Sequence, residues 1–186
     1  MGLIQFVKNV GRKLDLDKAF KNMQQGLGEH VKNQLASPAV GQQGPSANDV
    51  AQLEERKREL ALVSLINQMG FKVRELAVDV EGSKASIRGQ VDSQEEREKI
   101  VLMVGNTEGI DAVEDRLQVS RPQPEAQFYD VKSGDSLSKI AKQFYGDANQ
   151  YRLIFEANHP MLKDPDEIYP GQKLRIPVMA AVGTHA

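Results

Sequence analysis

The sequence of 186 residues predicts an α+β protein in which two small domains follow an N-terminal helical segment. Two runs of hydrophobic patterning carry this prediction. From residue 50 to residue 120, a helical period is followed by two alternating stretches, a second helical period and a third alternating stretch. From residue 127 to residue 177, strand, helix, helix and strand signals follow in that order. Each run is long enough to form a small domain with its own core.

The N-terminal segment, residues 1–35, is expected to be helical and to pack on the first domain. Its apolar side chains recur at helical spacing, at Leu3, Phe6, Val7, Val10 and Leu14. Gly11 interrupts the pattern, so a first helix is expected to end there. Residues 36–49 are small and polar and contain several Gly and Pro residues, which predicts a linker without a core face.

Turn and capping residues separate the elements of the first domain. Ser93, with Glu96 three residues later, has the form of a capping box at the start of a helix that stops at Gly105. The predicted order is helix, strand, strand, helix and strand, over residues 51–69, 76–80, 85–91, 94–104 and 113–119.

In the second domain, residues 127–177, a short strand runs into a Ser-Gly-Asp-Ser stretch. Ser136 or Asp135 suits the N-cap of the helix that follows. Asn158 ends a second helical stretch, and Pro170-Gly171 turns the chain into a final strand. Residues 121–126 are predicted to be a short, stiff linker, and residues 178–186 a tail.

These patterns resemble two known domain families. The strand-helix-helix-strand pattern resembles the LysM domain over nearly the whole of that family. The stretch from residue 50 to residue 120 resembles the BON domain, in particular at Val91-Asp92-Ser93 and at Gly105-Asn106-Thr107-Glu108-Gly109-Ile110. With Met1-Gly2-Leu3 and Phe6-Val7-Lys8 at the start, the arrangement is similar to the small cytoplasmic potassium-binding BON–LysM proteins of bacteria. The 36–49 linker and the tail are longer than in that family.

The loop that follows the helix 94–104 has a physical basis for holding a cation. A helix C-terminus leaves carbonyl groups without partners, and the helix dipole there favours positive charge. Gly105 ends the helix, and the irregular loop after it can turn several carbonyl oxygens towards one point; Val7–Gly11 is a second segment of this kind. Potassium can be held by a ring of backbone carbonyls that replaces its hydration shell. Without the resemblance, the loop reads as a plain turn and the apolar stripe near the N-terminus as core packing.

The resemblance implies that K+ is the bound ion and that main-chain carbonyl oxygens hold it. Position by position, the implied metal ligands are Val7, Val10, Gly105, Thr107, Ile110 and Ala112. It also implies a potassium sensor or buffer whose BON and LysM domains become more compact when the ion binds.

Two other functions remain open at this stage. A LysM domain implies binding of N-acetylglucosamine-containing glycans, in a groove formed by Gly134, Asp135, Ser136, Leu137, Ile154, Asn158 and His159. Some BON proteins act at phospholipid surfaces, and residues 3–14 are amphipathic. Membrane attachment is not expected, because the apolar face of residues 3–14 is needed inside the fold.

Composition argues against several classes of protein. The 24 basic and 26 acidic residues give a net charge of -2 without a basic cluster, so no nucleic-acid partner is expected. The chain has no Cys, and its three His residues are far apart in sequence, so neither a thiolate site nor a His-based catalytic site is predicted. Gln5 and Lys8 interrupt any export signal. We therefore expect a cytoplasmic protein, not an enzyme, and a monomer.

Overall fold

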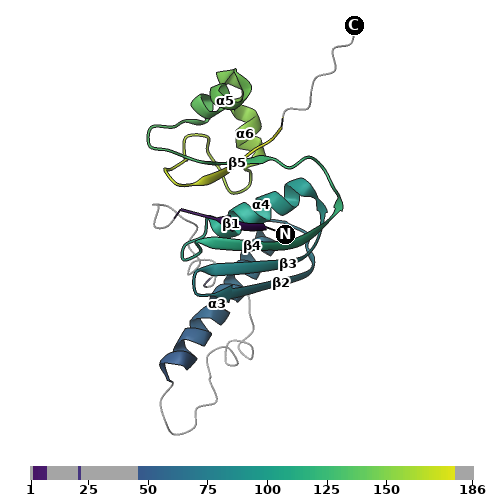
Figure 1. Cartoon of the computed structure of the whole chain (residues 1–186), viewed down its shortest axis with the longest axis vertical. Coiled ribbons are helices and arrows are strands. Elements are labelled where there is room, and N and C mark those ends of the chain that lie inside the picture. Colours follow the sequence, from purple (N-terminus) through teal and green to yellow (C-terminus); the bar gives the residue numbers. More distant parts are fainter. Residues whose placement is uncertain (1, 8–20, 22–45, 179–186) are drawn as a thin grey trace.

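The computed structural model describes residues 2–7, Lys21 and 46–178. It shows an α+β protein with two sheets, each associated with its own hydrophobic core (Figure 1). The first domain contains β1 (Gly2–Gln5), α3 (Ala47–Gln68), β2 (Arg74–Glu81), β3 (Lys84–Ser93), α4 (Gln94–Gly105) and β4 (Ala112–Arg121). The second contains β5 (Gln127–Asp130), α5 (Leu137–Tyr145), the 3-10 turn η1 (Ala148–Gln150), α6 (Tyr151–Ala157) and β6 (Lys173–Ile176).

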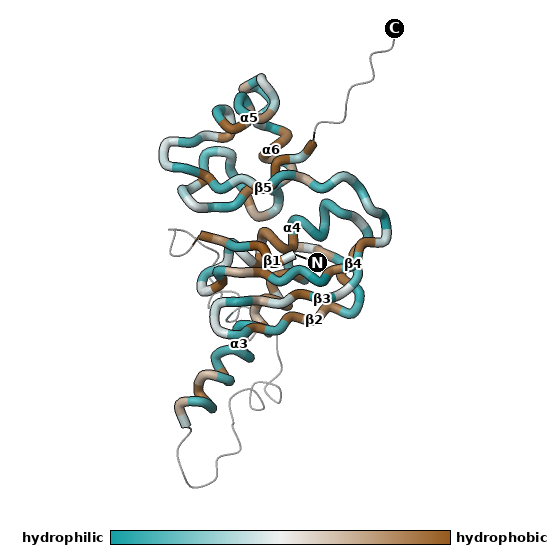
Figure 2. The backbone as a smooth tube through the Cα atoms, viewed as in Figure 1, coloured by the Kyte–Doolittle hydropathy of each residue, from teal (hydrophilic) through white to brown (hydrophobic). Residues whose placement is uncertain are grey.

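The sheet of the first domain has the strand order β1-β4-β3-β2. β2 and β3 form an antiparallel hairpin, whereas β3 and β4 are parallel and α4 makes the crossover between them. Buried side chains of α3, α4 and the strands belong to one cluster, so both helices cover the same face of the sheet. Figure 2 shows hydrophobic residues gathered where α4 meets the strands.

The prediction that the N-terminal segment is helical from residue 3 is wrong for the residues that the structure describes. Gly2–Gln5 is an edge strand that pairs antiparallel with β4, with Gln5 opposite Ala112. Phe6 follows the strand and is buried in the core of the first domain, while Leu3 and Val7 are exposed. The segment therefore does pack on this domain, but as a strand. Val10, Gly11 and Leu14 lie outside the described residues.

α3 starts before the predicted boundary of the linker. Ser46 is its N-cap, and the side chains of Ser46 and Asp49 form a complete capping box. Residues 47–49, expected in the linker, are therefore helical, because Ser46 satisfies the free N–H groups of the first turn. Further along, Glu59 accepts a hydrogen bond from the backbone N–H of Val80 at 3.2 Å, which helps to cover the free edge of β2.

α4 begins at the predicted cap, but only half of the predicted capping box forms. The Ser93 hydroxyl accepts a hydrogen bond from the Glu96 N–H at 3.2 Å. The Glu96 carboxylate does not return to Ser93, since it accepts from the backbone N–H of Lys72 at 2.9 Å. Glu96 thus ties α4 to the segment that enters β2.

In the second domain the predicted caps and turns are where the sequence indicates. Ser136, rather than Asp135, is the N-cap of α5, and Asn158 is the C-cap of α6. Gly171 has a φ of 82°, which a turn into β6 requires and which Gly adopts without strain. β5 and β6 form a two-stranded antiparallel sheet, and α5 and α6 pack on it. Residues 122–126 connect the two domains between β4 and β5.

Candidate metal centre

The C-terminus of α4 is buried and tightly turned. The backbone N–H of Asn106 donates to the Leu102 carbonyl at 2.9 Å, and that of Thr107 donates to the Val104 carbonyl at 3.1 Å. The Thr107 hydroxyl, which is fully buried, donates to the Met103 carbonyl at 2.8 Å. Three of the carbonyl groups at this helix end are therefore satisfied locally.

The carbonyl of Gly105 differs from these three. Among the described residues, no donor forms a hydrogen bond with it. The Thr107 carbonyl accepts one long bond of 3.3 Å, from the N–H of Ile110. Because the C-terminal end of a helix carries partial negative charge, oxygens here are suited to a cation.

The N-terminal strand runs directly beside this loop. The backbone N–H of Phe6 donates to the Asp111 carbonyl at 2.8 Å, which continues the pairing of β1 with β4. Val7, the next residue, is exposed. Backbone pairing thereby holds the residue before Val7 against the 105–112 loop.

Phe6 also contacts the end of α4 with its ring. A Cβ atom added to Gly105 would lie 2.0 Å from the nearest ring carbon, a distance that no side chain can adopt. Glycine at position 105 is thus required by the close approach of Phe6. On the side of the second domain, the Lys173 ammonium lies 5.5 Å from the centre of the same ring, within the range of a cation–π contact.

The structure places five of the six predicted ligands in these two adjoining segments. Gly105 and Thr107 are at the end of α4, Ile110 is buried in the loop, and Val7 follows the paired strand. Ala112 is already part of β4, with Gln5 and Lys84 as its neighbours. Val10 lies outside the described residues.

Side chains do not offer an alternative metal site in the described part of the chain. Residues 2–7, 21 and 46–178 contain no group of three His, Cys, Asp or Glu side chains that could hold a metal ion.

Sequence reasoning missed the contact between this loop and the second domain. The Asn106 amide donates to the Lys173 carbonyl at 2.9 Å and accepts from the Lys173 N–H at 3.0 Å. Both bonds are buried. The local pattern indicates only a loop residue at Asn106, because a partner 67 positions away leaves no signal in it.

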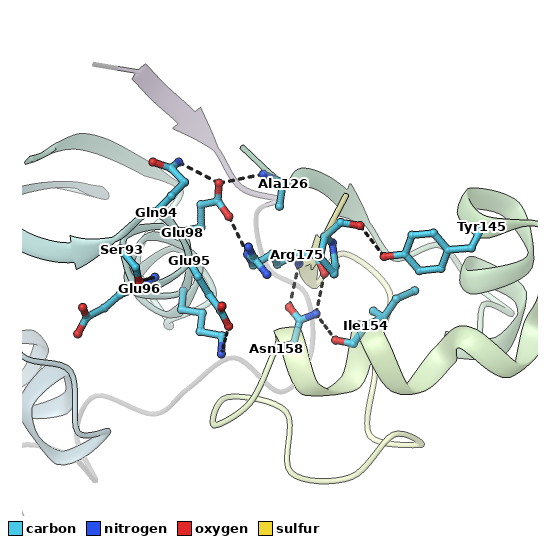
Figure 3. A network of polar contacts seen from close by, with 12 residues as sticks. Ser93, Gln94, Glu95, Glu96, Glu98, Ala126, Tyr145, Ile154, Asn158 and Arg175 are labelled. Carbon is cyan, nitrogen blue, oxygen red and sulfur yellow. Dashed lines mark hydrogen bonds and ion pairs between the residues drawn. The ribbon is translucent and has the colours of Figure 1, made fainter. Parts of the chain in front are cut away.

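A second contact between the domains is a buried ion pair, shown in Figure 3. The Glu98 carboxylate on α4 accepts from the Arg175 guanidinium on β6 at 2.7 Å, and both side chains are at most 10% exposed. Glu98 also accepts from the Gln94 amide and from the backbone N–H of Ala126, each at 2.9 Å. The second domain and the linker thus meet at one carboxylate.

Comparisons with known proteins agree with this division into two domains. Residues 59–121 match the BON domain family, and residues 129–177 match the LysM domain family. Along 178 residues the chain is 40% identical to the potassium binding protein Kbp of Escherichia coli O6:H1, covering 95% of this chain and 99% of that protein. The chain belongs to the Kbp family.

Two further relatives of this Kbp family member match a smaller share of the chain. An uncharacterized protein of Deinococcus radiodurans is 35% identical over 153 residues, which is 75% of this chain and 58% of that protein. An esterase of Mycobacterium tuberculosis, Rv1288, is 47% identical over 47 residues only, which is 10% of its own length. That match is too short to suggest an esterase activity.

Three of the seven residues in the LysM groove that the resemblance implies are buried. The side chains of Leu137, Ile154 and Asn158 are buried. The Asn158 amide donates to the carbonyls of Ile154 and Arg175 and accepts from the Arg175 N–H, so both of its polar atoms are engaged within the domain.

The loop at the start of that groove is also engaged within the domain. The Asp135 carboxylate accepts from the Tyr129 hydroxyl at 2.9 Å and from the Lys132 N–H at 2.8 Å. Ser136 caps α5, and the Lys139 ammonium donates to the Gly134 carbonyl at 2.7 Å. Of the seven predicted groove residues, Gly134 and His159 are exposed, and the backbone N–H of His159 donates to the Glu156 carbonyl at 3.1 Å.

Proposed function

We propose that this chain binds K+ through main-chain carbonyl oxygens of two segments, the residues after β1 and the loop after α4. One observation carries the proposal. The end of the N-terminal strand is paired with the 105–112 loop, in a chain related over almost its whole length to a protein named for potassium binding. The ligand set that we propose is Val7, Val10, Gly105, Thr107, Ile110 and Ala112.

The chemistry of the loop supports a monovalent ion. Calcium and magnesium prefer carboxylate oxygens, and the loop contributes a single exposed carboxylate, that of Glu108, besides the Asp111 side chain at its end. Neutral carbonyl dipoles suit a weakly hydrated ion such as potassium, whose water shell they can replace. The dipole of α4 adds a favourable field at its C-terminus.

We further propose that the protein acts as a cytoplasmic potassium sensor or buffer. Asn106 connects the loop to β6, so an ion that orders the loop also favours the docked arrangement of the two domains. An ion shifts such an equilibrium only by its differential affinity for the docked state. The part of the chain that the structure describes contains no helix with the length and hydrophobicity of a membrane span.

Titration calorimetry at constant ionic strength tests the proposal. The intact chain is titrated with potassium, with sodium and with N-acetylglucosamine oligomers. We expect heat of binding with potassium only. In a separate thermal unfolding experiment, potassium alone should raise the melting temperature, since a ligand stabilises the state that binds it. Equal effects of sodium and potassium, or heat with the glycan alone, would contradict the potassium proposal.

A further inference from the structure

Two buried asparagines hold the outer edge of β6 in the same way. β5 pairs with one edge of β6, and on the other side Asn106 bonds both backbone groups of Lys173 while Asn158 bonds both backbone groups of Arg175. The four distances lie between 2.8 and 3.0 Å. An amide side chain that donates and accepts in this way replaces the neighbour strand that the edge lacks.

The two asparagines differ in where they come from. Asn158 is the C-cap of α6 and belongs to the same domain as β6. Asn106 is the C-cap of α4 in the other domain, and it stands between Gly105 and Thr107. The LysM domain therefore holds the loop of the candidate metal centre through Asn106, which lies between the two proposed ligands Gly105 and Thr107.

The two hydrogen bonds between Asn106 and Lys173 restrict the peptide groups on either side of Asn106. A side chain held by two buried hydrogen bonds fixes the position of its own Cα, and the Gly105 carbonyl belongs to the peptide that enters this residue. The Thr107 N–H is bonded to Val104 at the same time. The orientation of the Gly105 carbonyl is thus set from both sides, by α4 and by β6.

We infer that Asn106 is a positioning residue for the ion site, through which docking of the LysM domain sets potassium affinity and selectivity. The inference rests on the proposed function and adds the residue that regulates the site. Because a carbonyl ring discriminates between ions by the placement of its oxygens, loosening one of them lowers potassium affinity more than sodium affinity. By linkage, the factor by which docking raises potassium affinity equals the factor by which bound potassium raises the docking equilibrium constant.

The test compares Asn106→Ala with Asn158→Ala in the full chain. Both variants remove two buried bonds to β6, but only Asn106→Ala frees the loop. We expect potassium affinity to fall by about tenfold for Asn106→Ala and to change by less than about twofold for Asn158→Ala. The potassium-to-sodium affinity ratio, measured by calorimetry, should fall in Asn106→Ala alone.

A second variant keeps the inference testable if Asn106→Ala does not fold. Asn106→Asp has nearly the same shape and retains the bond from the Lys173 N–H, but it cannot donate to the Lys173 carbonyl. Its added negative charge would by itself strengthen cation binding. If Asn106 positions the loop, Asn106→Asp binds potassium more weakly in spite of that charge.

The outcomes separate the inference from the proposed function. A wild-type chain without potassium-specific heat would refute the proposed function itself. A wild-type chain that binds potassium, together with Asn106 variants of unchanged affinity and selectivity, or equal losses in the Asn106 and Asn158 variants, would overturn only the role of Asn106.

Discussion

At the scale of single residues, Gly105 has the closest contact to an added Cβ atom among the glycines that the structure describes, because the Phe6 ring lies against it. Gly105→Ala adds a methyl group 2.0 Å from the Phe6 ring, so the ring must leave its place in the core. We expect a loss of about 1–3 kcal/mol in the free energy of unfolding, as for other overpacked cores. Urea unfolding measures this loss, and potassium binding should weaken with it.

The matched control for that substitution is Gly2→Ala. Gly2 has nothing within 4 Å of an added methyl group, and it lies in the strand that precedes Phe6. The stability of Gly2→Ala should stay within about 0.5 kcal/mol of the natural chain. If the two variants were equally stable, the close approach of Phe6 to Gly105 would not exist in solution.

Tyr169 gives a prediction about alkaline pH. Burial raises the pKa of its phenol from 10.0 to about 12. Below pH 10 the phenol is neutral in both the folded and the unfolded chain. Between pH 10 and pH 12 the unfolded chain releases the proton and the folded chain keeps it, so stability falls as the pH rises.

Tyr169→Phe removes this titration. Urea midpoints measured from pH 9 to pH 12 should decline less steeply for Tyr169→Phe than for the natural chain, since Phe carries no ionisable group. Parallel pH profiles for the two proteins would show that the Tyr169 phenol is not buried.

At the scale of elements, β1 shows where sequence patterns stop being informative. The spacing of Leu3, Phe6 and Val7 fits a helical period, and a strand of four residues is too short to display alternation clearly. Its stability comes from pairing with β4, more than 100 residues later in the chain. A partner so distant leaves no local signal, so the strand could not be predicted from the sequence.

The elements with strong local signals were predictable. Ser93 and Ser136 mark the starts of α4 and α5 because a hydroxyl can satisfy a free N–H group of the first turn. Gly105 at a helix end likewise indicated the loop after α4, whereas its proposed ligand residues came from the family resemblance and remain a prediction. The role of Asn106, which ties that loop to β6, was not predictable, since it depends on how two domains dock.

Removal of residues 1–7 tests the role of β1. The truncated chain loses the pairing of β1 with β4 and the buried Phe6 ring, and with Val7 one proposed ligand. We expect weaker potassium binding and faster amide exchange in β4, while the hairpin of β2 and β3 stays protected. Leu3→Ala, at an exposed position of the same strand, serves as the control.

An unchanged affinity in the truncated chain would show that neither β1 nor Val7 contributes to the ion site. Unchanged exchange in β4 would show that β1 is not paired in solution.

At the scale of the whole molecule, the two domains are joined by a buried charge pair. Glu98→Gln leaves the Arg175 guanidinium buried without its counter-charge, which typically costs about 3–5 kcal/mol. The double variant Glu98→Met with Arg175→Met should recover part of that loss, because it leaves no buried charge, while the Gln94 amide and the Ala126 N–H lose their acceptor. Urea unfolding of the three proteins checks both expectations.

An exposed pair in the same chain provides the control. Glu54 and Lys57 on α3 form an ion pair of 2.7 Å with both side chains well exposed. Glu54→Gln should change stability by less than about 1 kcal/mol. If Glu98→Gln lowered stability no more than Glu54→Gln does, the domains would not be docked through the Glu98–Arg175 pair in solution.

The position of the ion is the most direct test of the carbonyl site. Crystals of the intact chain grown with thallium(I), a heavy substitute for potassium, reveal the ion by its anomalous scattering. We predict one strong peak at coordination distance from the carbonyl oxygens of Val7, Gly105 and Thr107. A peak beside carboxylate side chains, or none at the end of α4, would contradict the account.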